Sequence, residues 1–238
     1  MDDTPLASFS LTHVHYNADD PISYLCAWLA LVPQALCVIY ATLIWSSREV
    51  EVVLMGLGQF GCEVLNFALK RLIKEQRPPR MNGKGYGMPS SHAQFTAFFS
   101  VSLTLFLLLR HTPLPASPSH TPFSIPQRLL LSTVALICAA IVAWSRIYLN
   151  YHNPQQVFVG FSAGALSAVV WFAITDYLRR NGWVDWGLDT WAARELRMRD
   201  LVVEEDLVAP GWDRWERKRR DKRVGKGQNK ASESVKKR

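Results

Sequence analysis

Five stretches of the sequence are almost entirely apolar, and polar residues gather between them and at both ends of the chain. The apolar stretches cover residues 22–45, 50–69, 93–109, 129–144 and 157–178. A helix needs about 20 apolar residues to cross a bilayer, so each stretch predicts a transmembrane span. We therefore expect an all-α, multi-pass transmembrane helical bundle of about five spans.

The second and fourth stretches are the weaker candidates for spans. Glu63 interrupts the second, and the fourth is short. A buried core helix of a soluble bundle is the alternative for each of them. The mean hydropathy of the whole chain, +0.01, does not argue against a membrane protein, because the polar last sixty residues offset the apolar part.

The polar segments divide the chain into three expected parts. Residues 1–21 form a short polar lead, residues 22–178 the transmembrane part, and residues 179–238 a basic, Trp-containing tail. The end of the tail is rich in Lys and Arg, and we expect it to be disordered. Residues 110–128 are rich in Pro and Ser, which predicts a loop between two spans.

Neither the cysteines nor the first histidines predict a metal site. The four cysteines lie inside apolar stretches without CxxC spacing, which favours a packing role: Cys26, Cys37, Cys62 and Cys138. The sequence "LTHVHY" at 11–16 contains a His-x-His pair, but no further ligand lies near it in the sequence. We expect no metal and no other cofactor.

The distribution of positive charge raises a conflict about orientation. Five spans place the two ends of the chain on opposite sides, and a cytoplasmic basic tail places loops 70–92 and 145–155 together on the other side. Loop 70–92 nevertheless carries six cations: Lys70, Arg71, Lys74, Arg77, Arg80 and Lys84. The positive-inside rule would keep such a loop in the cytoplasm. A functional requirement for positive charge must therefore explain why this loop lies on the other side.

Three polar clusters at span ends suggest that this requirement is phosphate binding. In "KRLIKEQRP" Lys70 and Arg77 are seven residues apart, so they share a helix face if the second helix continues to the prolines at 78–79. In "PSSH" Ser90 or Ser91 can cap a helix that begins near His92. Such a helix start offers free N–H groups to an anion.

The third cluster, "SRIYLNYH", precedes the last span and contains Arg146 and His152. Asn153 suits the N-cap of the following helix and Pro154 its first position, so His152 lies just outside the helix start. A single interfacial cation is more often an anchor, and a single histidine near a helix end is more often a cap or surface residue. Three clusters at compatible span ends favour a phosphate site instead.

The chemistry of these clusters indicates phosphoryl transfer without a metal. No group of acidic residues is present to hold Mg²⁺, so Lys and Arg would have to neutralise the phosphate. Two histidines suggest a nucleophile and an acid. We expect His152 to attack phosphorus and form a phosphohistidine, and His92 to protonate the leaving oxygen and then activate water.

The three clusters resemble the KxxxxxxRP, PSGH and SRxxxxxH motifs of the type 2 phosphatidic acid phosphatase superfamily, which includes lipid phosphatases and vanadium haloperoxidases. They occur in the order and spacing of that superfamily. The resemblance implies an acid, His92, and a nucleophile, His152. It also implies the phosphate-binding residues Lys70, Arg77, Arg146, Ser90 and, through its backbone, Ser91. The superfamily has Asp four residues after the nucleophile, whereas this chain has Gln156, whose amide oxygen could hold His152 Nδ1–H but brings no charge.

Within the superfamily, "GYGMPSSH", "LTHVHY" and Gln156 resemble the dolichyl diphosphate phosphatases. This resemblance implies hydrolysis of dolichyl diphosphate in the endoplasmic reticulum membrane, with the site facing the lumen, to recycle the lipid carrier for protein N-glycosylation. The expected partners are the lipid substrate and the bilayer, and not nucleic acid. A phosphatidate or sphingoid phosphate phosphatase and a non-catalytic lipid-binding protein remain alternatives.

Overall fold

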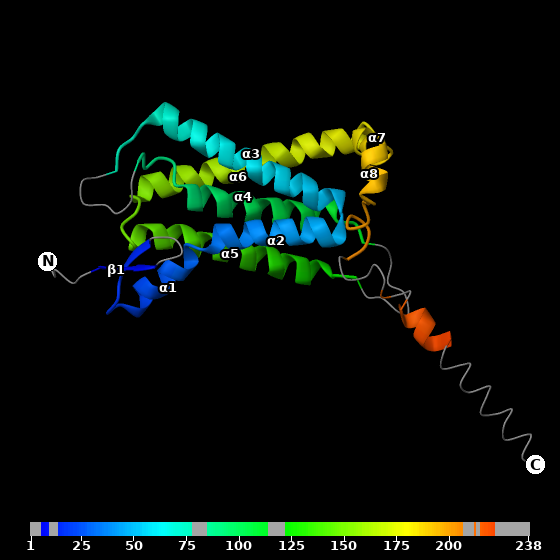
Figure 1. The fold of residues 1–238 in the computed structure, drawn as a ribbon, viewed down its shortest axis with the longest axis horizontal. Helices are drawn as coiled ribbons and strands as arrows, with labels where there is room; N and C mark the ends of the chain where they lie inside the picture. Colours follow the sequence, from blue (N-terminus) through cyan, green and yellow to red (C-terminus); the bar gives the residue numbers. More distant parts are fainter. Residues whose placement is uncertain are drawn as a thin grey trace, which may run out of the picture.

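A short antiparallel hairpin precedes a bundle of long helices (Figure 1). The computed structural model describes residues 6–9, 14–77, 85–113, 122–206, 212 and 215–221. In chain order the elements are β1 (Leu6–Phe9), β2 (Val14–Asn17), α1 (Pro21–Leu29), α2 (Val32–Ser47), α3 (Val50–Ile73), α4 (Ser91–Leu105), the π-helix η1 (Phe106–Arg110), α5 (Ile125–Tyr148), α6 (Pro154–Arg180), α7 (Trp183–Leu188) and α8 (Trp191–Glu195). The apolar pattern did not predict the hairpin, which pairs Leu6 with Asn17 and Phe9 with Val14.

The described residues contain five segments that are long and apolar enough to cross a membrane, which confirms the predicted bundle. They are Pro21–Ser47, Val50–Ile73, Ser91–Arg110, Ile125–Tyr148 and Pro154–Arg180. The two weaker candidates are helices of 24 residues. In their most apolar parts only 22% and 33% of the residues are buried. They are therefore not buried core helices of a soluble bundle. The first segment is broken between α1 and α2, at residues 30–31.

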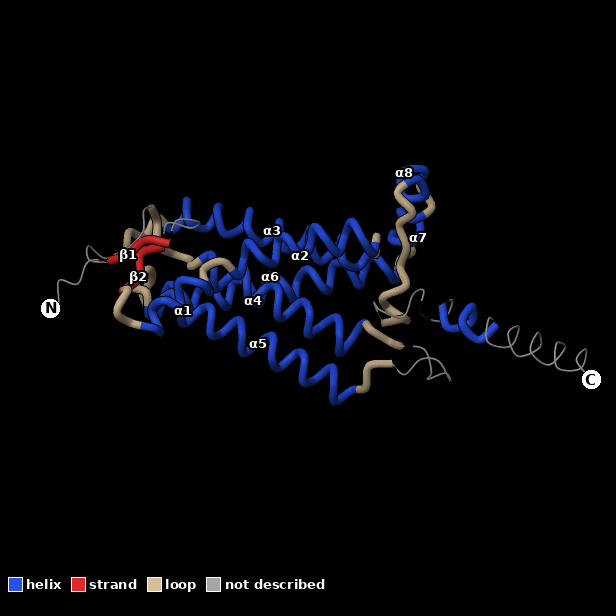
Figure 2. Tube along the Cα trace, turned by 60° about the horizontal axis from the view of Figure 1, so that its bottom comes forward, coloured by secondary structure: helices blue, strands red, loops and turns tan. Residues whose placement is uncertain are grey.

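Helix α4 lies at the centre of the bundle. In the most apolar part of the segment that contains α4, 56% of the residues are buried, against 22–33% in the corresponding parts of the other four segments. The outer helices instead expose large apolar side chains such as Phe60 on α3, Leu130 on α5 and Leu166 on α6. An apolar surface of this kind suits contact with lipid. The helices run lengthwise between the hairpin at one end and α7–α8 at the other (Figure 2).

Two glycines allow α6 to lie directly against the backbone of α4. A Cβ atom at Gly160 would lie 2.6 Å from the carbonyl oxygen of Ser90, and one at Gly164 only 2.1 Å from that of Gln94. Small residues permit such close helix packing in membranes. The contact brings the first turn of α6 to the start of α4, where the Ser90 amide donates to the Gln156 carbonyl at 3.1 Å.

The described part of the expected tail packs against the end of the bundle opposite the hairpin. Glu51 at the start of α3 accepts hydrogen bonds from Arg110 and Arg179, both at 2.6 Å, and Arg179 also pairs with Asp200. Val202 packs in a buried cluster with residues of η1. Residues 181–206 therefore extend the folded part of the chain beyond the last span. Residues 222–238, where we expect disorder, lie outside the described residues.

Candidate active site

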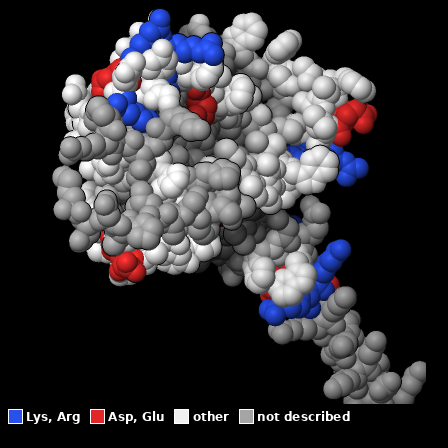
Figure 3. Space-filling model, turned by 60° about the vertical axis from the view of Figure 1, so that its left-hand side comes forward, with Lys and Arg blue, Asp and Glu red and all other residues white. Residues whose placement is uncertain are grey.

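The three polar clusters meet at the end of the bundle that carries the hairpin (Figure 1). Helix α3 ends there, α4 begins there, and the chain turns there between α5 and α6. Figure 3 views the molecule from this end, and Lys and Arg side chains gather near its upper rim. Three segments that are distant in sequence thus bring the predicted phosphate-binding residues to one place.

The predicted continuous helix from Lys70 to Arg77 is wrong. Helix α3 stops before Lys74, whose backbone is left-handed with φ of 52°, and Arg77 lies on the following loop. A left-handed residue at a helix C-terminus ends the helix because it turns the chain away from the axis. The prolines at 78–79, which we expected to end the helix, lie outside the described residues. Lys70 and Arg77 therefore do not share a helix face.

The two cations still reach the same site by different routes. Lys70 comes from the last turn of α3, and Arg77 comes from the loop. The Arg77 guanidinium donates a hydrogen bond to the backbone carbonyl of Tyr151, the residue before His152. Both cations interact electrostatically with His152. The loop thus brings Arg77 close to His152 without a longer helix.

The start of α4 presents a buried serine. Ser90 is the N-cap residue, as predicted, but its side chain makes no capping hydrogen bond. Its hydroxyl is fully buried and has no hydrogen-bond partner among the described residues. Ser91 begins the helix, so its backbone lies at the positive end of the helix dipole.

Arg146 is the third predicted cation, and it is almost completely buried with 2% of its surface exposed. Its guanidinium lies over the Tyr151 ring, 5.1 Å from the centroid. Nε and Nη2 have no hydrogen-bond partner among the described residues. A buried guanidinium is costly to leave without acceptors. An anion with several oxygens would supply acceptors for Arg146 and for the hydroxyl of Ser90.

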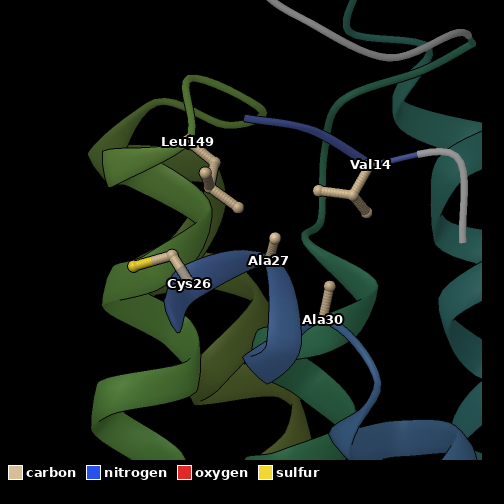
Figure 4. Packing of buried hydrophobic residues seen from close by; sticks show 5 residues of the cluster. All are labelled: Val14, Cys26, Ala27, Ala30 and Leu149. Carbon is tan, nitrogen blue, oxygen red and sulfur yellow. The ribbon is translucent and has the colours of Figure 1, made fainter. Parts of the chain in front are cut away.

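His92 contacts the break between α1 and α2. Its Nε2 lies 3.1 Å from the carbonyl oxygen of Ala30. A carbonyl only accepts hydrogen bonds, so Nε2 carries the proton and Nδ1 is left to exchange protons with a substrate. Ala30 belongs to a buried cluster with Val14, Cys26, Ala27 and Leu149, which joins α1 to β2 and to the end of α5 (Figure 4). This cluster fixes the carbonyl that orients His92.

His152 lies directly before α6, where the sequence predicted it. Pro154 starts the helix, and the Asn153 side chain accepts from the backbone N–H of Gln156 at 2.7 Å. Oε1 of Gln156 lies 3.1 Å from His152 Nδ1, which is the contact we expected. An amide oxygen only accepts, so Nδ1 carries the proton and Nε2 keeps its lone pair.

Electrostatics keep this imidazole neutral. Burial, and after it the nearby cations with Arg77 foremost, lower the pKa of His152 to about 3, although the hydrogen bond with Gln156 raises it. The charged form is disfavoured because burial removes its hydration and because like charges surround it. A neutral imidazole with a free Nε2 is a competent nucleophile at physiological pH.

Comparisons with known proteins identify the family. The family model of the PAP2 superfamily matches residues 51–180. This chain belongs to the PAP2 superfamily. A structural relative is a transmembrane PAP2-type phosphatidylglycerolphosphate phosphatase from Bacillus subtilis, whose crystal structure has a TM-score of 0.50 and 26% identity, covering 66% of this chain and 74% of that one.

Curated relatives match most of the chain. A Neurospora crassa protein named "Putative dolichyldiphosphatase" is 51% identical over 91% of this chain and 94% of its own length. "Dolichyldiphosphatase 1" of Dictyostelium discoideum is 36% identical, covering 86% and 87%. "Dolichyldiphosphatase" of Saccharomyces cerevisiae is 30% identical, covering 84% and 86%.

Around this PAP2 site, several contacts involve residues that the motifs did not single out. Nε2 of Gln156 donates to a carboxylate oxygen of Glu75 at 2.9 Å. The Tyr151 hydroxyl accepts from the backbone N–H of His15 at 2.8 Å, so part of "LTHVHY" ties the hairpin to the site. His13 lies outside the described residues. Glu75 lies inside "KRLIKEQRP". An acidic side chain within an otherwise cationic motif was the sequence signal that could have pointed to its role in the site.

In the part of the chain that the structure describes, the donor groups of this PAP2 member do not gather as metal ligands. Among the described residues no group of three or more His, Cys, Asp and Glu could hold a metal ion. The four cysteines are free; Cys26 and Cys62 are buried, and Cys37 and Cys138 face outward. The charged side chains that the structure brings to the site are mainly cations, which suits direct contact with an anionic substrate.

Proposed function

We propose that this protein hydrolyses dolichyl diphosphate to dolichyl phosphate and inorganic phosphate through a phosphohistidine on His152. The observation that carries the mechanism is the geometry of His152, whose Nδ1 faces Gln156 Oε1 and whose Nε2 is left free beside three cations. The relatives named dolichyldiphosphatase support the substrate. The product would re-enter the lipid carrier pool for protein N-glycosylation.

The reaction proceeds in two displacements at phosphorus. Nε2 of His152 forms a bond to the terminal phosphorus, and the bond from that phosphorus to the bridging oxygen breaks. His92 enters this step protonated on both ring nitrogens; its Nδ1 proton goes to the departing dolichyl phosphate, and the phosphoryl group stays on His152. Water then attacks the phosphohistidine, His92 takes a proton from that water, and inorganic phosphate leaves. Lys70, Arg77 and Arg146 neutralise the phosphate oxygens in both steps.

The amide at position 156 suits a diphosphate better than a monoester. Gln156 orients His152 but carries no charge to stabilise the imidazolium-like ring that forms on attack. The leaving group of a diphosphate is a phosphate ester, which departs more easily than an alkoxide. A weaker orienting group is therefore compatible with this substrate class.

We assign an apolar groove between the helices that carry the site to the first isoprene units of the substrate chain. It has a volume of about 290 Å³ and is lined by residues of α1, α2, α4 and α5, among them Leu29, Thr96, Ala135 and Val142. Leu29 precedes the residue that orients His92, Thr96 lies one turn beyond His92, and Val142 lies one turn before Arg146. Two of its lining residues therefore lie within one helical turn of His92 and of Arg146.

Filling this groove should weaken the use of long-chain substrates. Ala135→Phe, on the groove side of α5, is expected to lower kcat/KM for dolichyl diphosphate by roughly tenfold, and to change turnover of a short-chain prenyl diphosphate little. The control is Ala140→Phe, at an exposed position of the same helix. Equal effects of the two variants on both substrates would contradict the groove assignment.

We propose that the site faces the lumen of the endoplasmic reticulum. The opposite end of the bundle carries Arg48, Arg128, Arg180 and Arg194 and leads into the basic tail, which favours a cytoplasmic location for that end. A glycosylation acceptor introduced near position 82, which lies outside the described residues, should be modified. One appended after residue 238 should not be. The reverse pattern would overturn this orientation.

Catalysis should not require a divalent metal. The proposed charge stabilisation comes from Lys70, Arg77 and Arg146, so activity in detergent is expected to survive EDTA. Vanadate should inhibit strongly, since its five-coordinate form resembles the transition state. An activity that disappears in EDTA and returns with Mg²⁺ would exclude this arrangement.

A side-by-side substrate assay tests the proposed function. Purified protein is offered dolichyl diphosphate, dolichyl phosphate and phosphatidate, and phosphate release is measured. We expect the diphosphate to be preferred. Preference for a monoester would favour a phosphatidate or sphingoid phosphate phosphatase. Complementation of a deletion strain by the His152→Ala variant would favour a non-catalytic lipid-binding role.

A further inference from the structure

Glu75 is the far end of a hydrogen-bonded chain that leads to His152. Gln156 Oε1 lies 3.1 Å from His152 Nδ1, and Gln156 Nε2 donates to Glu75 Oε1 at 2.9 Å. Gln156 is completely buried, and His152 is 4% exposed. The amide is therefore held at both of its ends, by the proposed nucleophile on one side and by a carboxylate on the other.

The carboxylate determines which way the amide points. An ionised carboxylate only accepts hydrogen bonds, so the NH₂ group of Gln156 must face Glu75 and the oxygen must face His152. That oxygen requires a proton on Nδ1 and leaves the lone pair on Nε2. An amide without this partner can turn its NH₂ group towards Nδ1. The ring would then carry its proton on Nε2, which could not attack phosphorus.

The loop after α3 is built to hold this carboxylate in place. The amide of Gly87 donates to the carbonyl oxygen of Glu75 at 2.9 Å, and Gln76 forms an antiparallel bridge with Tyr86. A Cβ atom at Gly87 would lie 2.5 Å from Nε2 of Gln156, so the absence of a side chain makes room for the amide. The loop thus positions Glu75 and accommodates Gln156 together.

We propose that Glu75 is a positioning residue for phosphoryl transfer, which fixes the Gln156 amide and through it the tautomer of His152. This inference rests on the proposed function of the site. When Nε2 bonds to phosphorus, Nδ1 keeps its proton and the ring gains positive charge. Glu75 polarises the side-chain amide of Gln156, which accepts from His152 Nδ1–H. Glu75 thereby stabilises the positive charge on the ring without touching it. No proton moves along the chain of hydrogen bonds.

Exchanging the amide and the carboxylate tests this proposal. Glu75→Gln is expected to lower kcat roughly 10- to 100-fold, as removal of an outer orienting group does elsewhere, with KM nearly unchanged because Glu75 does not touch the substrate. Gln156→Glu should also be impaired, since it would place two carboxylates against each other. The double variant Glu75→Gln/Gln156→Glu restores one carboxylate and one amide, with all hydrogen bonds satisfied.

The double variant should exceed each single variant in kcat by about tenfold or more, a coupling typical of groups in one network. Gln155→Ala, which removes an exposed amide next to Gln156, is the control and should leave kcat unchanged. A purely structural role of Glu75 predicts no rescue. Additive losses in the double variant, or a Glu75→Gln kcat within twofold of the unmodified protein, would overturn the proposal.

The tautomer itself gives a readout that does not depend on the substrate. In protein with ¹⁵N-labelled histidine, the His152 signal, identified by its loss in His152→Asn, should show a proton on Nδ1. Glu75→Gln should shift the signal towards the other tautomer, and the double variant should restore it. An unchanged tautomer in Glu75→Gln would contradict the proposal. An unmodified protein with no activity on dolichyl diphosphate would instead contradict the proposed function alone.

Discussion

Replacing His152 with alanine is expected to remove all detectable turnover while leaving the fold intact. The proposal places the bond to phosphorus on Nε2 of this ring, and the other histidine of the site is held by a backbone carbonyl at Ala30. The position tolerates a smaller residue, because the turn before α6 is fixed by backbone hydrogen bonds from Tyr151 and His152 to the Arg146 carbonyl. Phosphate release in detergent measures the effect, and a thermal melt checks folding.

Covalent trapping gives the same prediction a second measurement. Rapid quenching after addition of substrate labelled in its terminal phosphate should yield an acid-labile phosphoprotein from the unmodified chain and none from His152→Ala. His92→Ala is the informative comparison, because the first step expels a good leaving group and should still label the protein, while hydrolysis of the phosphohistidine slows. Labelled protein in the His152→Ala variant would place the nucleophile elsewhere.

The spans were predictable because bilayer thickness imposes a length on any apolar helix. That the three motifs lie together was predictable for a related reason. The end of the second span, the start of the third and the turn between the fourth and the fifth fall on the same side of a membrane. The route of Arg77 was not predictable, because the left-handed turn at Lys74 replaces a helix that the spacing alone allows. A lysine carries no sequence signal for φ above zero, unlike glycine.

The partners that orient the two histidines were harder to infer than the histidines themselves. Gln156 could be assigned because its contact with His152 is local, four residues along the chain. Ala30 and Glu75 act over long separations in sequence, and Ala30 does so through its backbone, which every residue type shares. Such contacts depend on how α1 and the loop after α3 pack on the bundle, and hydrophobic periodicity does not specify that packing.

Replacing Gln156 with alanine is expected to lower kcat by a factor on the order of 10² to 10³, less than the roughly 10⁴ lost when an orienting carboxylate is changed and the wrong tautomer results. The alanine leaves His152 free to rotate and to move its proton to Nε2, but a fraction of the rings still holds the productive tautomer. Burial and the nearby cations are unchanged, so the ring stays neutral. KM should change little, because Gln156 faces His152 and Glu75 and not the substrate.

Gln155→Ala supplies the matched control for this variant. Gln155 is the preceding residue, carries the same side chain and lies exposed on the first turn of α6, whereas Gln156 is completely buried. Both substitutions remove one amide from the same helix start, so a general weakening of that start would affect both. We expect kcat of Gln155→Ala to match the unmodified protein. If Gln156→Ala were equally active, the amide would not orient His152, and the proposed link from Glu75 to the nucleophile would lose its middle member.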